Sequence, residues 1–309
     1  MKNIGIIDIG SNTVHLSIVR VEHNGSIRIL NQDKEHIHLG SNIKLKKNID
    51  SEKILDTLDT LKRYSLLCSH YGVENIITVA TEALRVAENS GFVIDCIKKY
   101  TGLSVRVLSK FEEAYLSYLG VSSTYNLKDC ILMDLGGSST ELVSVKNHSF
   151  VEYISLPYGS INTFEKIKLT STGEYISCDY SDSFFDDIFS EIPFLNHKNT
   201  NLLFGIGGTC KNLKNIFEKQ QKPNATATSF ATIDAVDLLS LCSKLNSMST
   251  AGRSNINGLS PKRCDLILGG IQIISSLINH YDFNKICICD EGLRTGLLIN
   301  CIHPKLTLE

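Results

Sequence analysis

The chain has 309 residues, of which 42% are hydrophobic and 21% are charged, and its formal net charge is −2. This composition is typical of a globular protein with a sizeable core, and the length is sufficient for two domains. A protein that coats nucleic acid is usually strongly basic, so the charge argues against that class. The sequence has no run of about 18 apolar residues and therefore predicts no membrane span.

The N-terminus and the cysteines indicate a cellular location. Met1-Lys2-Asn3 leads directly into a strand pattern that contains Asp8, which does not resemble a secretory signal peptide. Most of the ten cysteines lie in apolar helix or strand patterns, as in "CILMD" and "ICICD". Buried, reduced cysteines of this kind are typical of the cytosol. We therefore expect a cytoplasmic protein.

The first 120 residues predict three strands followed by alternating helices and strands. An alternating apolar pattern marks the strands, and apolar residues three and four positions apart mark the helices, the last of which is expected to end at Gly120. The expected order is βββαβαβα, with strands at 4–9, 14–22, 26–38, 75–80 and 104–109 and helices at 52–71, 82–100 and 111–119. The helix at 82–100 is expected to have a break near Ser90-Gly91.

The same order then repeats with insertions. The opening of the first copy, "IIDIGSNTVHLSIV", matches "LMDLGGSSTELVSV" at residues 132–145. An internal repeat of this kind predicts two similar α/β domains, each a mixed sheet flanked by helices, with a cleft between them. The second copy has expected strands at 130–134, 139–146, 150–156, 201–206 and 285–290 and helical segments at 160–192, 209–219, 233–245, 263–280 and 292–301.

Three glycine-rich turns contain the polar residues of most interest. They are Asp8–Thr13, Asp134–Thr140 and Gly205–Thr209, and the third runs directly into a helix. Glycine allows a ligand to approach the backbone closely, and consecutive N–H groups in such turns form anion-binding concavities. A helix N-terminus also favours an anion. Two matched turns and a third at a helix start favour phosphate binding over a purely structural role.

Carboxylates beside these turns suit a metal ion. Asp134 ends a strand and Glu141 follows the same turn, and Mg²⁺ prefers hard oxygen ligands of this kind next to phosphate. Glu112 and Glu113 lie in the first turn of a helix, where acidic residues favour the helix dipole, so periodicity alone assigns neither a role.

Several motifs follow one another along the chain. They are "DIGSNTVHL", "VATEALRVAENSGF", "VLSKFEEAYLSYLG", "DLGGSSTELV", "SLPYGSINTFE", "GIGGTCKNL" and "EGLRTGLL". Together they resemble the exopolyphosphatase/guanosine pentaphosphate phosphatase family, within the actin and sugar-kinase superfamily, and the resemblance covers essentially the whole chain. It implies two ribonuclease-H-like domains at 1–124 and 125–292, with a C-terminal helix at 293–309 that packs back on the first.

The resemblance also implies roles for individual residues. Glu113 corresponds to the family's general base, and Asp134 and Glu141 correspond to its ligands for Mg²⁺, with Mn²⁺ as the alternative, or for the attacking water. Arg85 is similar to the family's cleft arginine, and Lys211 and Arg263 are candidates for substrate contact. The residues expected to bind phosphate are Asp8, Ser11, Asn12, Arg85, Gly136, Gly137, Ser138, Ser139, Gly207, Gly208, Thr209, Lys211 and Arg263.

Two departures from the family pattern bear on activity. Ser138 replaces the usual third glycine, which would cost stability if that position needs a positive φ and would otherwise add a phosphate donor. Asn162 stands where the family often has arginine, so one basic contact is expected to be missing.

The expected activity is hydrolysis of the terminal phosphoanhydride of inorganic polyphosphate. Guanosine pentaphosphate 5′-phosphohydrolysis, an ATP-dependent kinase activity and a non-catalytic sensor of polyphosphate or alarmone are the alternatives. The family resemblance also leads us to expect a homodimer.

Overall fold

The computed structural model describes residues 1–23, 25–180, 183–196, 200–221, 228 and 230–307. The chain forms two compact units, Met1–Glu113 with Asn300–Glu309, and Ala114–Ile299. The chain division therefore follows Glu113, whereas the sequence analysis placed it after residue 124. It falls there because the remainder of helix α5 (Lys110–Ser122) packs on the sheet of the second unit, through residues such as Ala114 and Val121.

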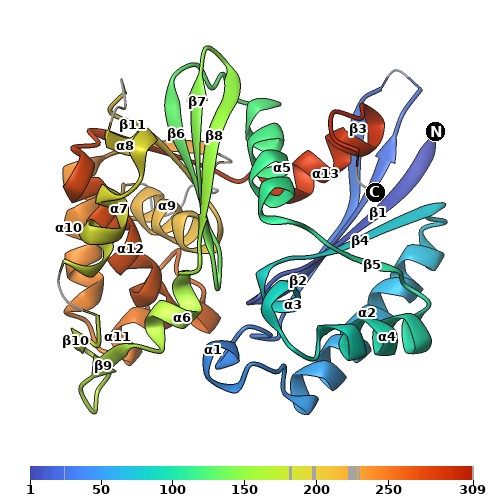
Figure 1. The fold of residues 1–309 in the computed structure, drawn as a ribbon, viewed down its shortest axis with the longest axis horizontal. Coiled ribbons are helices and arrows are strands. Elements are labelled where there is room, and N and C mark those ends of the chain that lie inside the picture. Colours follow the sequence, from blue (N-terminus) through green and yellow to red (C-terminus); the bar gives the residue numbers. More distant parts are fainter. Residues whose placement is uncertain (24, 181–182, 197–199, 222–227, 229, 308–309) are drawn as a thin grey trace. The chain divides into compact units, whose positions relative to one another are not determined.

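The first unit is built on a five-stranded mixed sheet with the order β3-β2-β1-β4-β5 (Figure 1). Strands β1, β2 and β3 form an antiparallel meander, and β4 and β5 continue the sheet in parallel with β1. The strands are β1 Lys2–Ile9, β2 Thr13–Val21, β3 Ile27–His36, β4 Asn75–Ala80 and β5 Val105–Val107.

Helices of the first unit cover one face of this sheet. In α2, Ile54, Leu58 and Leu61 lie three or four positions apart, so they share one buried face and join the core with Ile7 and Ile9 of β1. The predicted helix at 82–100 is two helices, as the expected break indicated, and the interruption lies at 87–89, just before Ser90. The helices are α1 Ile43–Lys46, α2 Ser51–His70, α3 Glu82–Val86 and α4 Ser90–Thr101.

The second unit is built on a six-stranded sheet with the order β12-β13-β11-β6-β7-β8. Strands β6, β11 and β13 are parallel, so their carboxyl ends meet at one edge. The strands that were not predicted are β9 and β10, which form a hairpin within 160–192, and the antiparallel edge strand β12. The strands are β6 Cys130–Leu135, β7 Thr140–Lys146, β8 Ser149–Leu156, β9 Ile167–Leu169, β10 Tyr175–Cys178, β11 Leu202–Ile206, β12 Phe230–Asp234 and β13 Lys285–Cys289.

Helices lie on both faces of the second sheet. Helices α7, α9, α10 and α12 cover the face that includes Ile131 and Met133, and α5 covers the face that includes Cys130 and Leu132 (Figure 1). The helices are α6 Ser160–Phe164, α7 Phe184–Ser190, α8 Pro193–Asn196, α9 Gly208–Gln221, α10 Ala235–Asn246, α11 Thr250–Ser254, η1 Pro261–Arg263, α12 Leu266–Tyr281 and α13 Leu293–Ile302.

Gly120 does not end helix α5 as predicted. The helix continues to Ser122. Gly120 instead allows close packing against the start of α13. A Cβ at Gly120 would lie 2.1 Å from the carbonyl oxygen of Gly292, and one at Gly296 would lie 1.8 Å from that of Leu116. Neither position can accept a larger residue without movement of the backbone.

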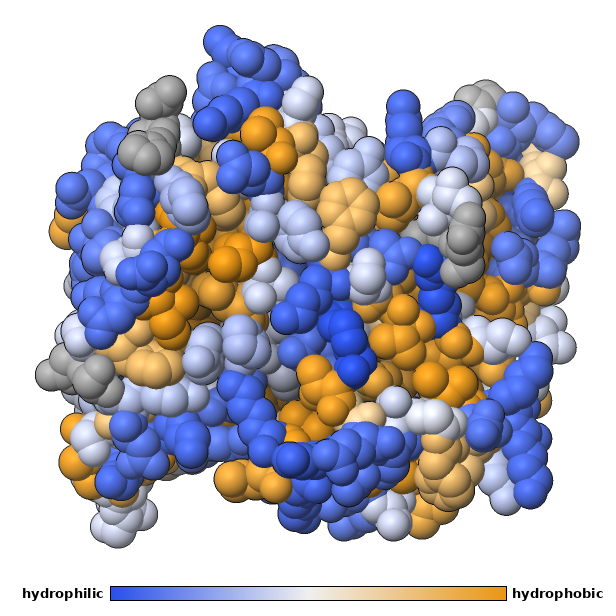
Figure 2. All heavy atoms as spheres, in the orientation of Figure 1, coloured by the Kyte–Doolittle hydropathy of each residue, from blue (hydrophilic) through white to orange (hydrophobic). Residues whose placement is uncertain are grey.

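Three further observations concern the surface, the helices and the cysteines. The tip of the β7–β8 hairpin is hydrophilic (Figure 2), with Lys146, Asn147 and His148 exposed. Within the described ranges, every helix is too short or too polar to cross a membrane. All ten cysteines are free thiols.

Candidate functional site

In the first turn, the carbonyl oxygens accept hydrogen bonds, whereas two backbone N–H groups donate none to the described residues. Gly10 N–H donates to the Thr13 carbonyl at 3.1 Å, which closes the turn. Backbone N–H groups of segment 37–40 donate to the carbonyl oxygens of Ser11 and Asn12 at 2.8 to 3.2 Å. The N–H groups of Ser11 and Asn12 have no acceptor among the described residues. The acceptors of this turn are therefore occupied while two of its donors are available.

The second turn repeats this construction. Gly136 N–H donates to the Ser139 carbonyl at 3.0 Å. Residues 160–162, at the start of α6, donate to the carbonyl oxygens of Gly136, Gly137 and Ser138 at 2.7 to 3.0 Å. Within the described part of the chain, the N–H groups of Gly137 and Ser138 have no acceptor. Adjacent N–H groups without acceptors, next to carbonyl oxygens that already accept hydrogen bonds, favour the binding of an anion.

Both departures from the family pattern have a structural answer. Ser138 is not among the residues with positive φ, so the serine causes no backbone strain. Its buried hydroxyl has no hydrogen-bond partner among the described residues. Asn162 accepts a hydrogen bond from Gly159 N–H at 2.8 Å and donates to the Ser138 carbonyl at 2.9 Å. Asn162 therefore supports the second turn, a role different from the basic contact that an arginine at this position would make.

The third turn lies at the carboxyl end of β11. Gly207 has φ 94°, and a Cβ there would lie 2.3 Å from the Leu135 carbonyl oxygen, so only glycine fits. Helix α9 begins at the next residue, and the buried Thr209 hydroxyl has no partner within the described residues. The turn thus joins a helix N-terminus with an unused hydroxyl group.

Arg263 lies directly over this third turn. A Cβ on Gly208 would lie 2.3 Å from Cζ of Arg263. No acceptor in the described part of the chain pairs with the guanidinium. Burial lowers the pKa of Arg263 to about 10, because the charged form is desolvated without compensation. An anion bound to the turn would supply the missing counter-charge.

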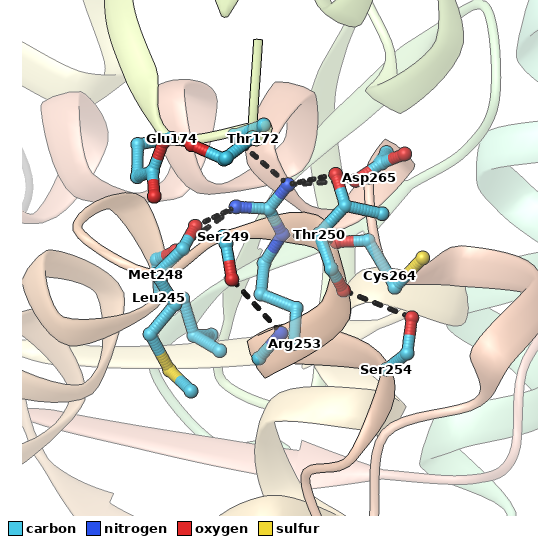
Figure 3. Close-up of polar contacts among 12 residues, drawn as sticks. Thr172, Glu174, Leu245, Met248, Ser249, Thr250, Arg253, Ser254, Cys264 and Asp265 are labelled. Carbon is cyan, nitrogen blue, oxygen red and sulfur yellow. Dashed lines mark hydrogen bonds and ion pairs between the residues drawn. The ribbon is translucent and has the colours of Figure 1, made fainter. Parts of the chain in front are cut away.

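The position of Arg263 depends on a second arginine. Arg253 is fully buried, and its guanidinium donates to the Cys264 carbonyl at 2.7 Å and to Asp265 at 2.6 Å, as Figure 3 shows. It also donates to the carbonyl oxygens of Gly173 and Met248. Arg253 is therefore a structural residue that fixes the segment immediately after Arg263.

Lys211, which the sequence analysis expected to bind phosphate, forms an ion pair with a carboxylate of the chain. Its ammonium pairs with Asp290 at 3.2 Å, and the buried Lys214 pairs with the other oxygen of Asp290 at 3.0 Å. Asp290 follows β13, so this cluster lies at the same sheet edge as the third turn. The two lysines neutralise the aspartate, and Lys211 keeps a half-exposed side chain.

Asp134, Glu141 and Ser155 form one row across strands β6, β7 and β8. The Ser155 hydroxyl donates to Glu141 at 2.8 Å, and the Ser117 hydroxyl donates to Asp134 at 2.6 Å. Burial raises the pKa of Asp134, although the Ser117 hydrogen bond and the Arg294 charge oppose the shift. Two neighbouring carboxylates in a partly desolvated row form a donor set that fits a divalent cation.

The repeat in the first unit lacks this excess of negative charge. The equivalent row across β1, β2 and β3 is Asp8, His15 and Lys34, in which acidic and basic groups are adjacent. Among the described residues, no group of three or more His, Cys, Asp or Glu side chains could enclose a metal. Mg²⁺ usually takes one or two carboxylates and completes its shell with water and substrate phosphate, so the row at Asp134 fits it.

Glu112 and Glu113 have different environments. Glu112 forms a capping box with Ser109 at the start of α5 and pairs with Arg106. Glu113, which is 7% exposed, contacts Arg85 at 2.8 Å. Arg85 therefore binds the predicted base in this structure, although the sequence analysis expected it to bind phosphate.

The sequence of the chain is similar to that of known phosphatases. Residues 17–304 match the model of the Ppx/GppA phosphatase family. The chain belongs to this family. A curated relative, the bifunctional 3-dehydroquinate synthase/phosphatase of Fusobacterium nucleatum subsp. nucleatum, is 28% identical over 97% of this chain. The chain spans about half, 46%, of that relative's length.

Solved structures of the family have the same fold. An exopolyphosphatase from Cytophaga hutchinsonii is 24% identical, with a TM-score of 0.86 over 97% of this chain and 98% of that chain. The Aquifex aeolicus Ppx/GppA family member is 25% identical, with a TM-score of 0.77 over 97% of each chain. The predicted fold class, two actin-like α/β domains with mixed sheets, is confirmed.

Four supporting residues were missed in the sequence analysis. Ser117 and Ser155 contact the two carboxylates, Asn162 supports the second turn, and Glu82 contacts Arg85. Helical spacing could have identified two of them, because Ser117 lies one turn after Glu113 and Glu82 lies one turn before Arg85. The other two depend on strand register and on a turn-to-helix contact that periodicity does not show.

Proposed function

We propose that the chain is an exopolyphosphatase that hydrolyses the terminal phosphoanhydride of inorganic polyphosphate with Mg²⁺ or Mn²⁺. The observation that supports this most strongly is the twice-built turn, whose carbonyl groups are covered and whose N–H groups remain available. Arg263, with no partner in the described part of the chain, adds a third anion-binding element. Several anion sites in one chain suit a substrate with several phosphates.

In this mechanism, Glu113 orients a water molecule and accepts its proton as the water oxygen attacks the terminal phosphorus. The bridging P–O bond breaks, orthophosphate leaves, and the shortened chain keeps the bridging oxygen. The N–H groups of the turns and the Arg263 guanidinium stabilise the charge on the phosphate oxygens. A magnesium ion held by Asp134 and Glu141 would neutralise further phosphate charge when bound.

The alternatives are weaker. Family membership supports a phosphatase, and the Cytophaga relative is named an exopolyphosphatase. A non-catalytic sensor was plausible only if Ser138 strained its turn, and its φ is not positive. No observation favours a guanine-binding element, so guanosine pentaphosphate is the second candidate substrate.

The test is phosphate release by the purified chain with Mg²⁺ from tripolyphosphate, long polyphosphate, guanosine pentaphosphate and ATP in parallel. Glu113→Gln is the test variant, and Glu112→Gln is the matched control on the next residue. The proposal predicts release from polyphosphate that is lost only in Glu113→Gln. Release only from guanosine pentaphosphate would replace the substrate, and binding without release would favour the sensor.

A further inference from the structure

Arg85 joins two buried carboxylates in the first unit. Its Nη2 contacts Glu82 at 2.6 Å and Glu113 at 2.8 Å, and its Nε donates to Glu82 at 2.9 Å. The two glutamates are 5% and 7% exposed. One guanidinium thus stands between two carboxylates that have little access to water.

The remaining edge of Arg85 is also occupied. Nη1 donates to the Leu108 carbonyl at 2.7 Å. Arginine has five N–H donors in a rigid plane, so contacts on Nε, Nη1 and Nη2 leave the group little freedom to rotate. Burial acts to lower the pKa of Arg85, but the contacts with Glu113 and Glu82 outweigh it and raise the pKa.

The local structure explains why the contacts meet. Glu82 and Arg85 lie three residues apart in α3, which places them on the same face of that helix. Leu108 follows β5, which is parallel to β4, and its N–H donates to the Ala80 carbonyl at 2.9 Å. The ends of these two strands therefore fix both the helix with Glu82 and the carbonyl that receives Nη1.

A buried carboxylate lowers the stability of the fold unless it is paired, and Glu82 is paired with Arg85. Its contacts orient the Arg85 plane, and that plane determines where Nη2 meets Glu113. We propose that Glu82 is a positioning residue that acts through Arg85 to fix the carboxylate of Glu113 and to offset the positive charge beside it. This inference rests on the proposed function of Glu113 as the base.

The direction of the effect follows from electrostatics. Without the charge of Glu82, Arg85 would stabilise the ionised form of Glu113 more strongly, so the pKa of Glu113 would fall. A weaker and less well oriented base would lower the rate of the chemical step. Among the described residues, the hydrogen bonds and the ion pair of the Glu82 side chain go to Arg85 and not to the turns expected to bind phosphate, so substrate binding should change little.

The experiment compares Glu82→Gln with the wild type, because glutamine keeps the shape and one acceptor but removes the charge. Glu112→Gln is the matched control, since Glu112 also pairs with an arginine but does not contact Arg85. We expect Glu82→Gln to lower kcat between about 10-fold and 100-fold with KM within about twofold. The control should retain the wild-type kcat. Thermal melting of both variants checks that they fold.

A second readout does not depend on activity. Carboxyl-carbon NMR titration, with Glu113→Gln to assign the signal, gives the pKa of Glu113 directly. Glu82→Gln should lower it, and Glu112→Gln should leave it unchanged. An unchanged Glu113 pKa with unchanged kcat would overturn the inference, as would a lower KM at constant kcat, which would mean that Glu82 competes with substrate for Arg85.

The two proposals fail in different ways. If Glu113→Gln retains full activity, the assignment of the base fails, whatever Glu82→Gln does. If Glu113→Gln is inactive while Glu82→Gln behaves as the wild type, only the inference about Glu82 fails. If the wild type releases no phosphate, the NMR titration alone decides whether Glu82 controls Glu113.

Discussion

The Ser117 hydroxyl donates a hydrogen bond of 2.6 Å to Oδ2 of Asp134, and both residues belong to the second unit. This bond fixes the orientation of a carboxylate that burial otherwise disfavours in its charged form. Ser117 comes from α5, whereas Asp134 ends β6, so a helix that covers the sheet also holds the first carboxylate of the proposed metal site.

Ser117→Ala should therefore weaken the response to Mg²⁺. Loss of a residue that orients a metal ligand commonly costs about 10-fold to 100-fold in metal affinity. We expect the Mg²⁺ concentration for half-maximal phosphate release to rise by at least about 10-fold, with calorimetric Mg²⁺ binding weakened in parallel. Ser122→Ala is the control, because Ser122 lies on the same helix and its hydroxyl donates to the Leu119 carbonyl. Equal Mg²⁺ curves for the two variants would remove Ser117 from the account.

Arg263→Gln should stabilise the chain when no anion is present. The pKa of Arg263 is lowered to about 10, so the charged form is disfavoured in the folded state. The resulting loss of stability is fully present below pH 10 and is relieved as pH rises through that value, because the folded protein then releases the proton first.

Thermal melting at pH 7.5 in a buffer without phosphate or sulfate measures this effect. Arg263→Gln should melt a few degrees higher than the wild type, about 2–4 °C for each kcal/mol gained. Added tripolyphosphate should raise the Tm of the wild type more than that of the variant. A lower Tm for the variant with equal responses to tripolyphosphate would contradict the anion-binding role.

Asn162→Ala should damage the second turn. The change leaves the Gly159 N–H and the Ser138 carbonyl without their partners, each in a buried position. An unsatisfied buried polar group costs about 1–3 kcal/mol, so the free energy of unfolding should fall by at least that amount. Urea denaturation provides the measurement, and Asn48→Ala, which removes one exposed hydrogen bond, is the control. A loss no greater than that of the control would mean that the turn stands without Asn162.

Ser138→Gly tests whether the departure from the family motif inhibits activity. Ser138 has no positive φ, so glycine relieves no strain and should lower the free energy of unfolding by roughly 0.5–1 kcal/mol through chain entropy. The rate of phosphate release should not increase, because the serine hydroxyl is a further donor at the turn. A severalfold faster variant would show instead that Ser138 restrains the enzyme.

The repeated turns were the most predictable part of the molecule. Asp, an apolar residue, glycine and small polar residues recur in both copies, and each copy forms the same closed turn, at Gly10 and at Gly136. The antiparallel meander that contains each turn was also predicted, since alternation of apolar residues is a local signal. The β9–β10 hairpin was missed because its strands have only three and four residues.

Other features depended on contacts between distant residues. Gly120 was interpreted as a helix end, but it serves close packing against Gly292, which no local pattern reveals. Arg85 was expected to bind phosphate, and although helical spacing places Glu82 beside it, no local pattern shows that Glu113 would contact it as well. Arg263 was only a candidate for substrate contact from the sequence, and its place beside Gly208 and its lack of a partner within the described residues required the structure.

In the proposed mechanism, a water molecule activated by Glu113 attacks the terminal phosphorus of polyphosphate. The most direct measurement is hydrolysis of tripolyphosphate with Mg²⁺ in ¹⁸O-labelled water, followed by mass spectrometry of the released orthophosphate. The account predicts one ¹⁸O atom in each orthophosphate released by the wild type, and a rate lower by about 10²- to 10⁴-fold in Glu113→Gln. Release without incorporated ¹⁸O, or an undiminished rate in Glu113→Gln, would contradict it.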